Sequence, residues 1–197
     1  MTDKLNASIV CIDYRFDYLT TEYFDAIGQR ENYFLLSTAG SSLCLGYTDY
    51  VNQICNCRYI TPKHSCCNNN CTDPNNFDMK LLKESIKKNL DISLGLKDYD
   101  TIYMLNHQDC GAFKAYLECS GYPKYLGENN SLEIKINTDI LLFAKEYIQN
   151  EFPKITNLKL GLIDVNGYVA NYNTNFNSWE LQYRGPGCDP KGLWYGL

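Results

Sequence analysis

The chain has 197 residues, 45% of them apolar, which is enough for one α/β domain with its own hydrophobic core. Its formal net charge of −5 and its isoelectric point near 5.0 argue against a nucleic acid or an anionic membrane surface as partner, because both attract an excess of Lys and Arg. Residues 1–6 are polar and no apolar run approaches the roughly 20 residues that span a bilayer, so we expect a cytoplasmic protein without membrane contact.

The first predicted elements are two strands with a helix between them. A short β-branched run at 8–13 ends in polar residues and predicts a buried parallel strand. Apolar residues on one face predict a helix at 17–27. A second strand at 32–37 leads into the small residues Ala39 and Gly40, which let the backbone pass close to a ligand.

From about 44 to 77 the apolar periodicity disappears and Asn, Cys and Pro dominate, so we expect an irregular insertion. Irregular segments of this length inside a compact domain are usually functional, or are held by metal ions or disulfides. Six of the ten cysteines of the chain fall between Cys44 and Cys71. Because we expect no secretory signal, this enrichment favours metal binding or redox chemistry over a disulfide framework.

Helices and strands also alternate in the second half of the chain. They are, in chain order, a helix at 78–95, a strand at 101–105, a helix at 112–119, a helix at 132–152, a strand at 158–164, a hairpin strand at 168–172 and an irregular tail at about 173–197. The alternation predicts a single α/β domain over 1–197, with a mostly parallel central sheet flanked by helices and a C-terminal hairpin.

Candidate metal ligands follow two of these strands. Cys11 ends the first strand, while His107 and Cys110 lie in the loop after the strand at 101–105. The carboxyl ends of parallel strands share one edge of the sheet, where α/β proteins bind their ligands, so we expect the three side chains to meet there. Two cysteines and one histidine can hold zinc tetrahedrally and leave the fourth position open, as in catalytic sites. We therefore predict one catalytic zinc ion.

Asp13 and Arg15 come directly after Cys11 and are predicted to assist catalysis. Asp13 can accept a hydrogen bond at the metal, and Arg15 can keep Asp13 ionised through a two-pronged ion pair. Alone, each motif is weak, because a cysteine on a buried strand usually packs as a small apolar residue and Asp-x-Arg is usually a surface pair. Their joint position at strand ends, in a chain with only two histidines, favours the catalytic interpretation.

These residues carry a resemblance to the β-class carbonic anhydrases. Residues 11–15 (Cys-Ile-Asp-Tyr-Arg) resemble the Cys-x-Asp-x-Arg motif of that family, and residues 107–112 (His-Gln-Asp-Cys-Gly-Ala) resemble its His-x-x-Cys-Gly-Ala motif. Residues 37–40 are similar to its Ala-Gly loop, and residues 158–172 are similar to its final strand and hairpin. The resemblance covers about 8–172, apart from the insertion.

The resemblance implies a β-carbonic-anhydrase-like fold, reversible hydration of carbon dioxide to bicarbonate, and a homodimer with active sites near the subunit interface. The implied site residues are the zinc ligands Cys11, His107 and Cys110, the catalytic pair Asp13 and Arg15, and the pocket residues Ala39, Gly40 and Gly111. Two alternatives stay open, because the sequence does not show the pocket, and because Tyr14 replaces the usual Ser and residues 37–38 replace the usual Arg-Asn. One is hydrolysis of carbonyl sulfide or carbon disulfide, and the other is a zinc-binding pseudoenzyme with a structural or regulatory role.

A second group of candidate ligands lies in the insertion. Its members are Cys55, Cys57, His64, Cys66, Cys67 and Cys71. They suffice for a second, structural zinc ion, although their spacing matches no known zinc finger. Disulfides fit equally well if the protein reaches an oxidising compartment or a particle, and reduced surface thiols are a third interpretation.

Overall fold

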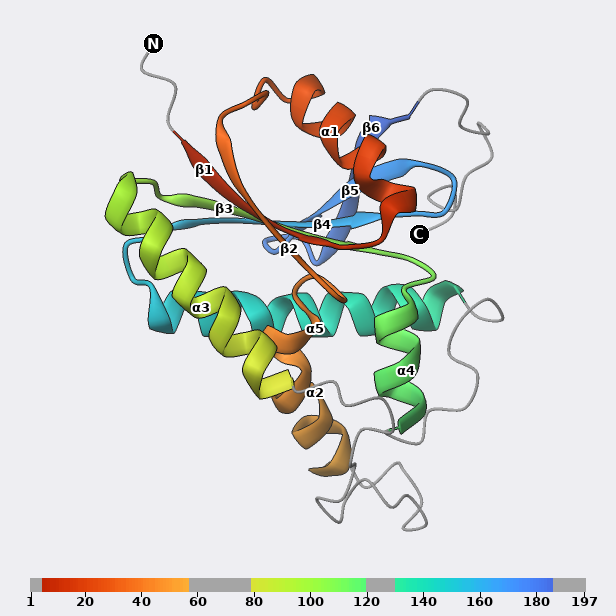
Figure 1. The fold of residues 1–197 in the computed structure, drawn as a ribbon. Coiled ribbons are helices and arrows are strands. Elements are labelled where there is room, and N and C mark those ends of the chain that lie inside the picture. Colours follow the sequence, from red (N-terminus) through yellow and green to blue (C-terminus); the bar gives the residue numbers. More distant parts are fainter. Residues whose placement is uncertain (1–4, 57–78, 120–129, 186–197) are drawn as a thin grey trace.

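A six-stranded sheet forms the centre of the protein (Figure 1). It is seen in a computed structural model that describes residues 5–56, 79–119 and 130–185. The strands are β1 (Asn6–Cys11), β2 (Tyr33–Thr38), β3 (Thr101–His107), β4 (Asn157–Ile163), β5 (Tyr168–Asn173) and β6 (Ser178–Arg184). Their order across the sheet is β2-β1-β3-β4-β5-β6.

The first four strands are parallel and the last two are antiparallel. β1 lies between β2 and β3, and β3 pairs with β4, all in parallel register. Every residue of β3 is buried, as its continuous apolar run requires of a strand covered on both faces. After β4 the chain turns at Gly167, whose positive φ of 85° suits glycine, and β5 and β6 return antiparallel. The predicted fold class is confirmed.

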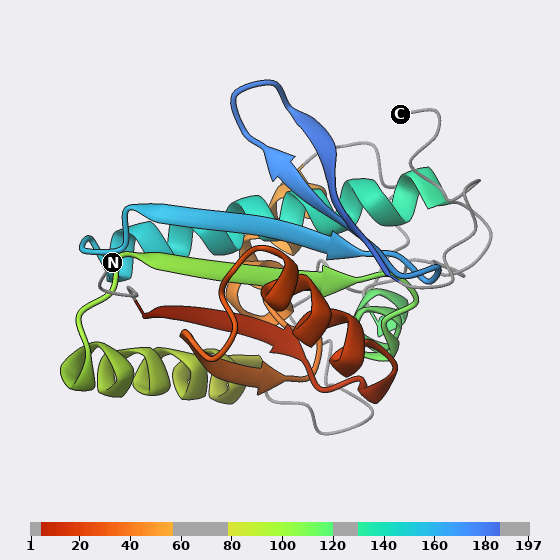
Figure 2. The same cartoon turned by 90° about the horizontal axis from the view of Figure 1, so that it is seen from above.

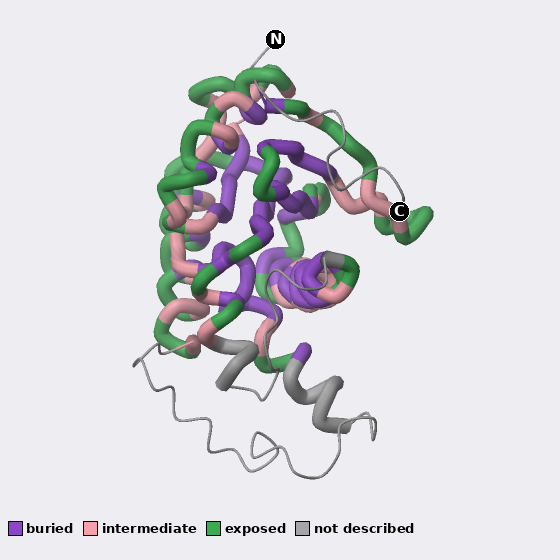
Figure 3. Tube along the Cα trace, turned by 90° about the vertical axis from the view of Figure 1, so that its right-hand side faces the viewer, coloured by how far each residue is buried: buried purple, intermediate pink, exposed green. Residues whose placement is uncertain are grey.

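Helices cover both faces of the sheet. They are the 3₁₀ helix η1 (Tyr14–Phe16) and the α-helices α1 (Asp17–Ala26), α2 (Leu43–Asn56), α3 (Met79–Leu96), α4 (Gly111–Cys119) and α5 (Asn130–Glu151). Figure 1 shows α1 on one face and α2, α3, α4 and α5 on the other. Figure 3 shows that the buried residues gather between these layers, so the sheet has an apolar core on each side.

Close contact between α2 and α5 organises the core on the larger helical face. Leu90 of α3 and Leu141 of α5 are fully buried there, and both belong to one apolar cluster with residues of β1 and β3. Gly46 of α2 lies directly against the backbone of α5, since a Cβ at this position would come within 2.3 Å of the carbonyl oxygen of Ile140. Glycine is therefore required for the two helices to approach this closely.

Two predictions of irregular structure are wrong in part. The insertion predicted at about 44–77 begins with α2, and the tail predicted at about 173–197 contains β6, while 57–78 and 186–197 lie outside the described residues. Both elements are stabilised by tertiary partners, α2 by packing on α5 and β6 by pairing with β5, which a local sequence pattern does not reveal. The other predicted elements begin and end within two residues of the observed ones.

The carboxyl ends of the four parallel strands form one edge of the sheet. Figure 2 shows the parallel strands ending together at this edge, beside η1 and the start of α4. In open α/β sheets, ligands bind in the crevice beyond these carboxyl ends. Across the described ranges, no helix combines the length and the apolar composition needed to cross a membrane.

Candidate metal centre

Three side chains with metal-binding atoms meet at the carboxyl edge of the sheet. Cys11 is the last residue of β1, His107 is the last residue of β3, and Cys110 directly precedes α4. Their ligand atoms all lie within 4.8 Å of one another, and the two sulfur atoms are 3.9 Å apart. The structure therefore brings together the three predicted ligands, two of which are 99 positions apart along the chain.

The imidazole of His107 presents one nitrogen to this cluster. Its Nδ1 lies 2.8 Å from the backbone carbonyl oxygen of Gln108, which can only accept, so Nδ1 carries a proton and Nε2 is the nitrogen that a metal ion can bind. The ring of Phe16 stacks on the imidazole at a centroid distance of 4.2 Å and fixes its plane. Among the described residues, none hydrogen bonds to the buried Nε2. A buried acceptor without a partner is unfavourable, so this atom fits a bound cation.

The two sulfur atoms share one stabilised thiolate, which the surroundings place on Cys11. The N–H of Gly40 donates to Sγ of Cys11 at 3.4 Å, and two backbone N–H groups at the start of α4 donate to Sγ of Cys110. The thiol of Cys110, together with His107 and Gly40, holds the pKa of Cys11 well below that of an ordinary thiol. The same sulfur pair, together with burial, raises the pKa of Cys110. Two such sulfur atoms and one imidazole nitrogen form a donor set that fits a borderline-soft metal ion.

Asp13 and Arg15 lie beside the cluster as a two-pronged ion pair. Nε and Nη2 of Arg15 donate to the two carboxylate oxygens of Asp13 at distances of 2.7 to 3.2 Å. The Arg15 guanidinium holds the pKa of Asp13 below its usual range, so this carboxylate stays ionised and can only accept hydrogen bonds. Oδ2 of Asp13 is 3.9 Å from Nε2 of His107. An ionised acceptor therefore lies next to the metal-binding atoms.

No family model matches the sequence, and no curated sequence is detectably similar to it. Its structure, however, is similar to that of the β-carbonic anhydrase CcaA, with a TM-score of 0.51 over 92% of this chain and 85% of that chain, at 13% sequence identity. The chain has the β-carbonic anhydrase fold.

Other solved structures are similar at lower scores. β-carbonic anhydrase isoform I from Trichomonas vaginalis matches with a TM-score of 0.43 and 16% identity, covering 84% of this chain and 80% of that chain. A carbon disulfide hydrolase matches with a TM-score of 0.40 and 12% identity, covering 83% of this chain and 75% of that chain. Both sequence identities are low, so this similarity is one of overall fold.

In this β-carbonic anhydrase fold, the cluster opens into a pocket of about 620 Å³. Ala39 and Gly111, two of the three residues expected in a pocket, lie in its lining together with the apolar side chain of Ile12. Gly40, the third predicted pocket residue, is buried and supports the Cys11 sulfur with its N–H. Its φ of 77° lies in the left-handed region, which favours glycine and turns the chain back toward the metal-binding edge.

A buried hydrogen-bond network holds the loop after β2 in place. Oδ1 of Asn106 accepts a hydrogen bond from the Ser42 hydroxyl at 2.7 Å, and Nδ2 of Asn106 donates to Oδ1 of Asn137 at 3.1 Å. The network joins the end of β3 to the start of α2 and to α5. Because its members are buried and paired, it fixes the relative positions of the loops that carry the cluster.

Sequence reasoning missed two acidic residues of this centre, Asp109 and Glu133. Asp109 accepts a hydrogen bond from the second edge of the Arg15 guanidinium, and Glu133 of α5 accepts one from the backbone N–H of Asp109. One signal for Asp109 was its place between two predicted ligands. The signal for Glu133 was a carboxylate on the helix face that also carries Asn137 and the buried apolar residues of α5.

The second group of predicted ligands lies largely outside the described residues. The members that fall within 57–78 are Cys57, His64, Cys66, Cys67 and Cys71. Cys55 lies in α2. Cys44, which belongs to the same cysteine-rich stretch, is a free thiol buried in the apolar core. A second zinc ion and disulfides both stay predictions.

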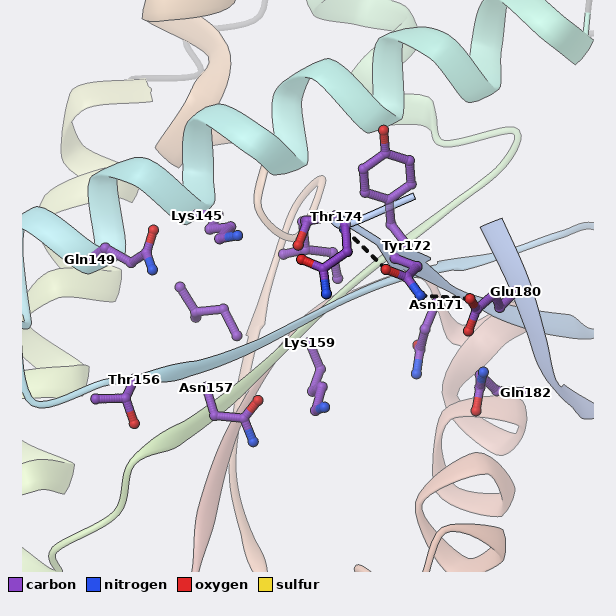
Figure 4. A pocket seen from close by; sticks show the side chains of 14 residues that line it. Lys145, Gln149, Thr156, Asn157, Lys159, Asn171, Tyr172, Thr174, Glu180 and Gln182 are labelled. Carbon is purple, nitrogen blue, oxygen red and sulfur yellow. Dashed lines mark hydrogen bonds between the residues drawn. The ribbon is translucent and has the colours of Figure 1, made fainter. Parts of the chain in front are cut away.

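A second cavity of about 470 Å³ lies away from the metal cluster (Figure 4). It is bordered by α5, by the first half of β4 and by the β5–β6 hairpin, and its lining is mostly polar, including Lys145 and Lys159. Asn173 donates to Glu180 at 2.7 Å on its hairpin side. The described lining contains neither cysteine nor histidine, so this cavity offers no place for the predicted metal chemistry.

Proposed function

We propose that the protein is a zinc-dependent carbonic anhydrase that reversibly hydrates carbon dioxide to bicarbonate. The observation that supports this most strongly is the placement of the Asp13 carboxylate. Arg15 holds it 3.9 Å from Nε2 of His107, beside a Cys₂His donor set. A purely structural metal site is satisfied by its own ligands, whereas an ionised acceptor beside an open coordination position serves proton and nucleophile chemistry.

Zinc is the proposed ion, with Cys11, His107 and Cys110 as its ligands. Two thiolates and an imidazole suit zinc among the divalent ions, and three protein ligands leave its fourth position to solvent or substrate. Zinc, when bound, supplies Lewis-acid chemistry that makes a nucleophile from water near neutral pH. Asp13 accepts a hydrogen bond at that position and so aims the reacting group, while Arg15 prevents Asp13 from taking up a proton.

The walls of the pocket support a small apolar substrate. Ile12, Ala39 and Ala112 line it, and these side chains offer no hydrogen bond to a polar molecule. Carbon dioxide is uncharged and apolar overall, so it enters such a pocket without a desolvation penalty. The charged groups of the pocket, Asp13 and Arg15, already pair with each other, which leaves the apolar wall to hold the substrate.

Stopped-flow hydration of carbon dioxide by the zinc-loaded protein, followed with a pH indicator, tests the proposal. Asp13→Ala is expected to keep zinc and to lose about 100-fold in rate, and Cys110→Ser is expected to lose both zinc and activity. Asp139→Asn is the control, because Asp139 pairs with Lys135 on the surface of α5. A wild-type rate equal to that of buffer, with zinc fully bound, would refute the hydratase and leave a zinc-binding pseudoenzyme. Carbon disulfide hydrolysis, assayed in parallel, identifies the related hydrolase.

We also propose a homodimer with the pocket near its interface. Two large side chains of the pocket lining are exposed, Ile12 by 63% and Tyr14 by 86%, and Tyr18 at the start of α1 is exposed by 61%. Neighbouring apolar groups with this much exposure are typical of a surface that a partner covers. Size-exclusion chromatography with light scattering is expected to give a dimer, which Tyr14→Glu weakens. A wild-type monomer at micromolar concentration would contradict the dimer.

A further inference from the structure

A buried carboxylate on α5 lies next to the candidate metal centre. Glu133 is only 3% exposed, and its Oε1 accepts a hydrogen bond from the backbone N–H of Asp109 at 2.6 Å. Burial raises the pKa of Glu133, and the hydrogen bond from Asp109 opposes that shift. Because burying a carboxylate is costly, the site gains something specific from its presence.

The partner of this carboxylate has an unusual backbone conformation. Asp109 has a φ of 53°, in the left-handed region, where side chains other than glycine are disfavoured and Asp is among the best tolerated. In this conformation its N–H points to Glu133, while its carbonyl oxygen and its carboxylate both face Arg15. The hydrogen bond to Glu133 therefore stabilises the conformation that presents two acceptors to one guanidinium.

Arg15 is consequently held on two edges. Nη1 donates to Oδ2 of Asp109 at 2.8 Å and Nη2 donates to the Asp109 carbonyl oxygen at 3.0 Å, while Nε and Nη2 hold Asp13. The side chains of Arg15 and Asp109 are 42% and 51% exposed, and ion pairs with that exposure are weak on their own. The hydrogen bond from the Asp109 N–H to the buried Glu133 is partly shielded from solvent, so it can hold Asp109 in place.

We propose that Glu133 is a positioning residue of this centre, which acts through Asp109 to hold the Arg15 guanidinium against Asp13. The effect on turnover rests on the proposed carbonic anhydrase function, whereas the effect on Arg15 does not. The polar chain runs from Glu133 through Asp109 and Arg15 to Asp13, so it couples a rigid helix to the two loops that flank the metal ligands. Glu133 acts through its hydrogen bond to the Asp109 N–H, so its proposed role is geometric.

Nitrogen-15 NMR of the zinc-loaded protein tests the proposal without reference to activity. The chain has four arginines, and the Nε–H signal of Arg15 is the one that Arg15→Lys removes. Glu133→Ala is expected to shift the Asp109 amide signal and to speed the exchange of Arg15 Nε–H with water by about fivefold or more, the factor for one lost hydrogen bond. Glu133→Gln, whose amide oxygen can accept the same hydrogen bond, is expected to restore slow exchange. Asp139→Asn on the same helix is the control.

A second variant and a kinetic measurement complete the test of the positioning role. If Glu133→Ala fails to fold, Asp109→Ala breaks the next link without changing the helix core and is expected to speed Arg15 Nε–H exchange by the same factor. In the hydration assay, Glu133→Ala is expected to lower kcat by about fivefold with KM and zinc content unchanged. Unaltered Arg15 exchange in Glu133→Ala or in Asp109→Ala would overturn the positioning role. An inactive wild-type protein with the expected NMR changes would overturn only the proposed function.

Discussion

Replacing Cys110 with serine should abolish the stabilisation of the protein by zinc while leaving the metal-free protein nearly as stable as before. The reason lies in the position of the sulfur, which is buried and accepts two backbone N–H groups at the start of α4. A serine oxygen is a preferred acceptor at a helix start, so it takes over these hydrogen bonds. It does not replace a thiolate as a zinc ligand.

The size of the effect follows from the three-ligand cluster. Zinc that binds only the folded state, at 100 times its dissociation constant, adds about 2.7 kcal/mol to the free energy of unfolding. In a chain of this length, 1 kcal/mol corresponds to about 2 to 4 °C in Tm, so zinc should raise the wild-type Tm by about 5 to 11 °C. For Cys110→Ser we expect an increase below about 2 °C, with a metal-free stability within about 1 kcal/mol of wild type.

Differential scanning calorimetry of each protein with and without zinc measures both quantities. Cys44→Ser is the matched control, because Cys44 is equally buried but lies in the apolar core, away from the cluster. A hydroxyl at position 44 should lower the free energy of unfolding by about 1 to 3 kcal/mol both with and without zinc, and should leave the zinc-dependent increase in Tm unchanged. A full zinc-dependent increase in Cys110→Ser would refute the ligand assignment, and so would its loss in Cys44→Ser.

Three more predictions concern the ion pair, a buried thiol and the helix contact. Arg15→Ala should retain zinc by metal analysis. Because Arg15 depresses the pKa of Asp13, the ion pair stabilises the fold above about pH 4, and this stabilisation disappears as the pH falls through the depressed pKa. The free energy of unfolding of Arg15→Ala, measured with urea, should lack this acid dependence. Burial raises the pKa of Cys44 to about 12, so iodoacetamide at pH 8 should modify it only after unfolding, and labelling of the native protein, seen by mass spectrometry, would contradict its burial. Gly46→Ala should cost about 3 kcal/mol in urea unfolding because the added Cβ meets the α5 backbone, whereas Gly95→Ala, with open space around it, should be neutral or stabilising.

Most elements of the fold follow from local patterns. The buried strands β1 and β3 each contain a short apolar run, and the helices α3 and α5 have apolar residues at helical spacing, so each was predictable within two residues. α2 was not predictable in this way, because its cysteine-rich, glycine-containing sequence has weak helix propensity and depends on packing against α5. β6 likewise depends on its partner β5, since an edge strand with exposed polar residues lacks a buried face.

In the candidate site, too, some features follow from local sequence patterns and others depend on tertiary contacts. The candidate ligands and their approximate position were predictable from the sequence, because Cys11, His107 and Cys110 lie at or just after the ends of predictable strands, and parallel strands in an α/β sheet end at one edge. The hydrogen bonds that support these candidate ligands became visible in the three-dimensional structure. Glu133 reaches Asp109 across 24 positions of the chain, and Arg15 reaches Asp109 across 94. The ability to bind a metal ion depends on the residue type, which can be read from the sequence. The orientation of a charged side chain depends on the distant loops and helices that pack around it.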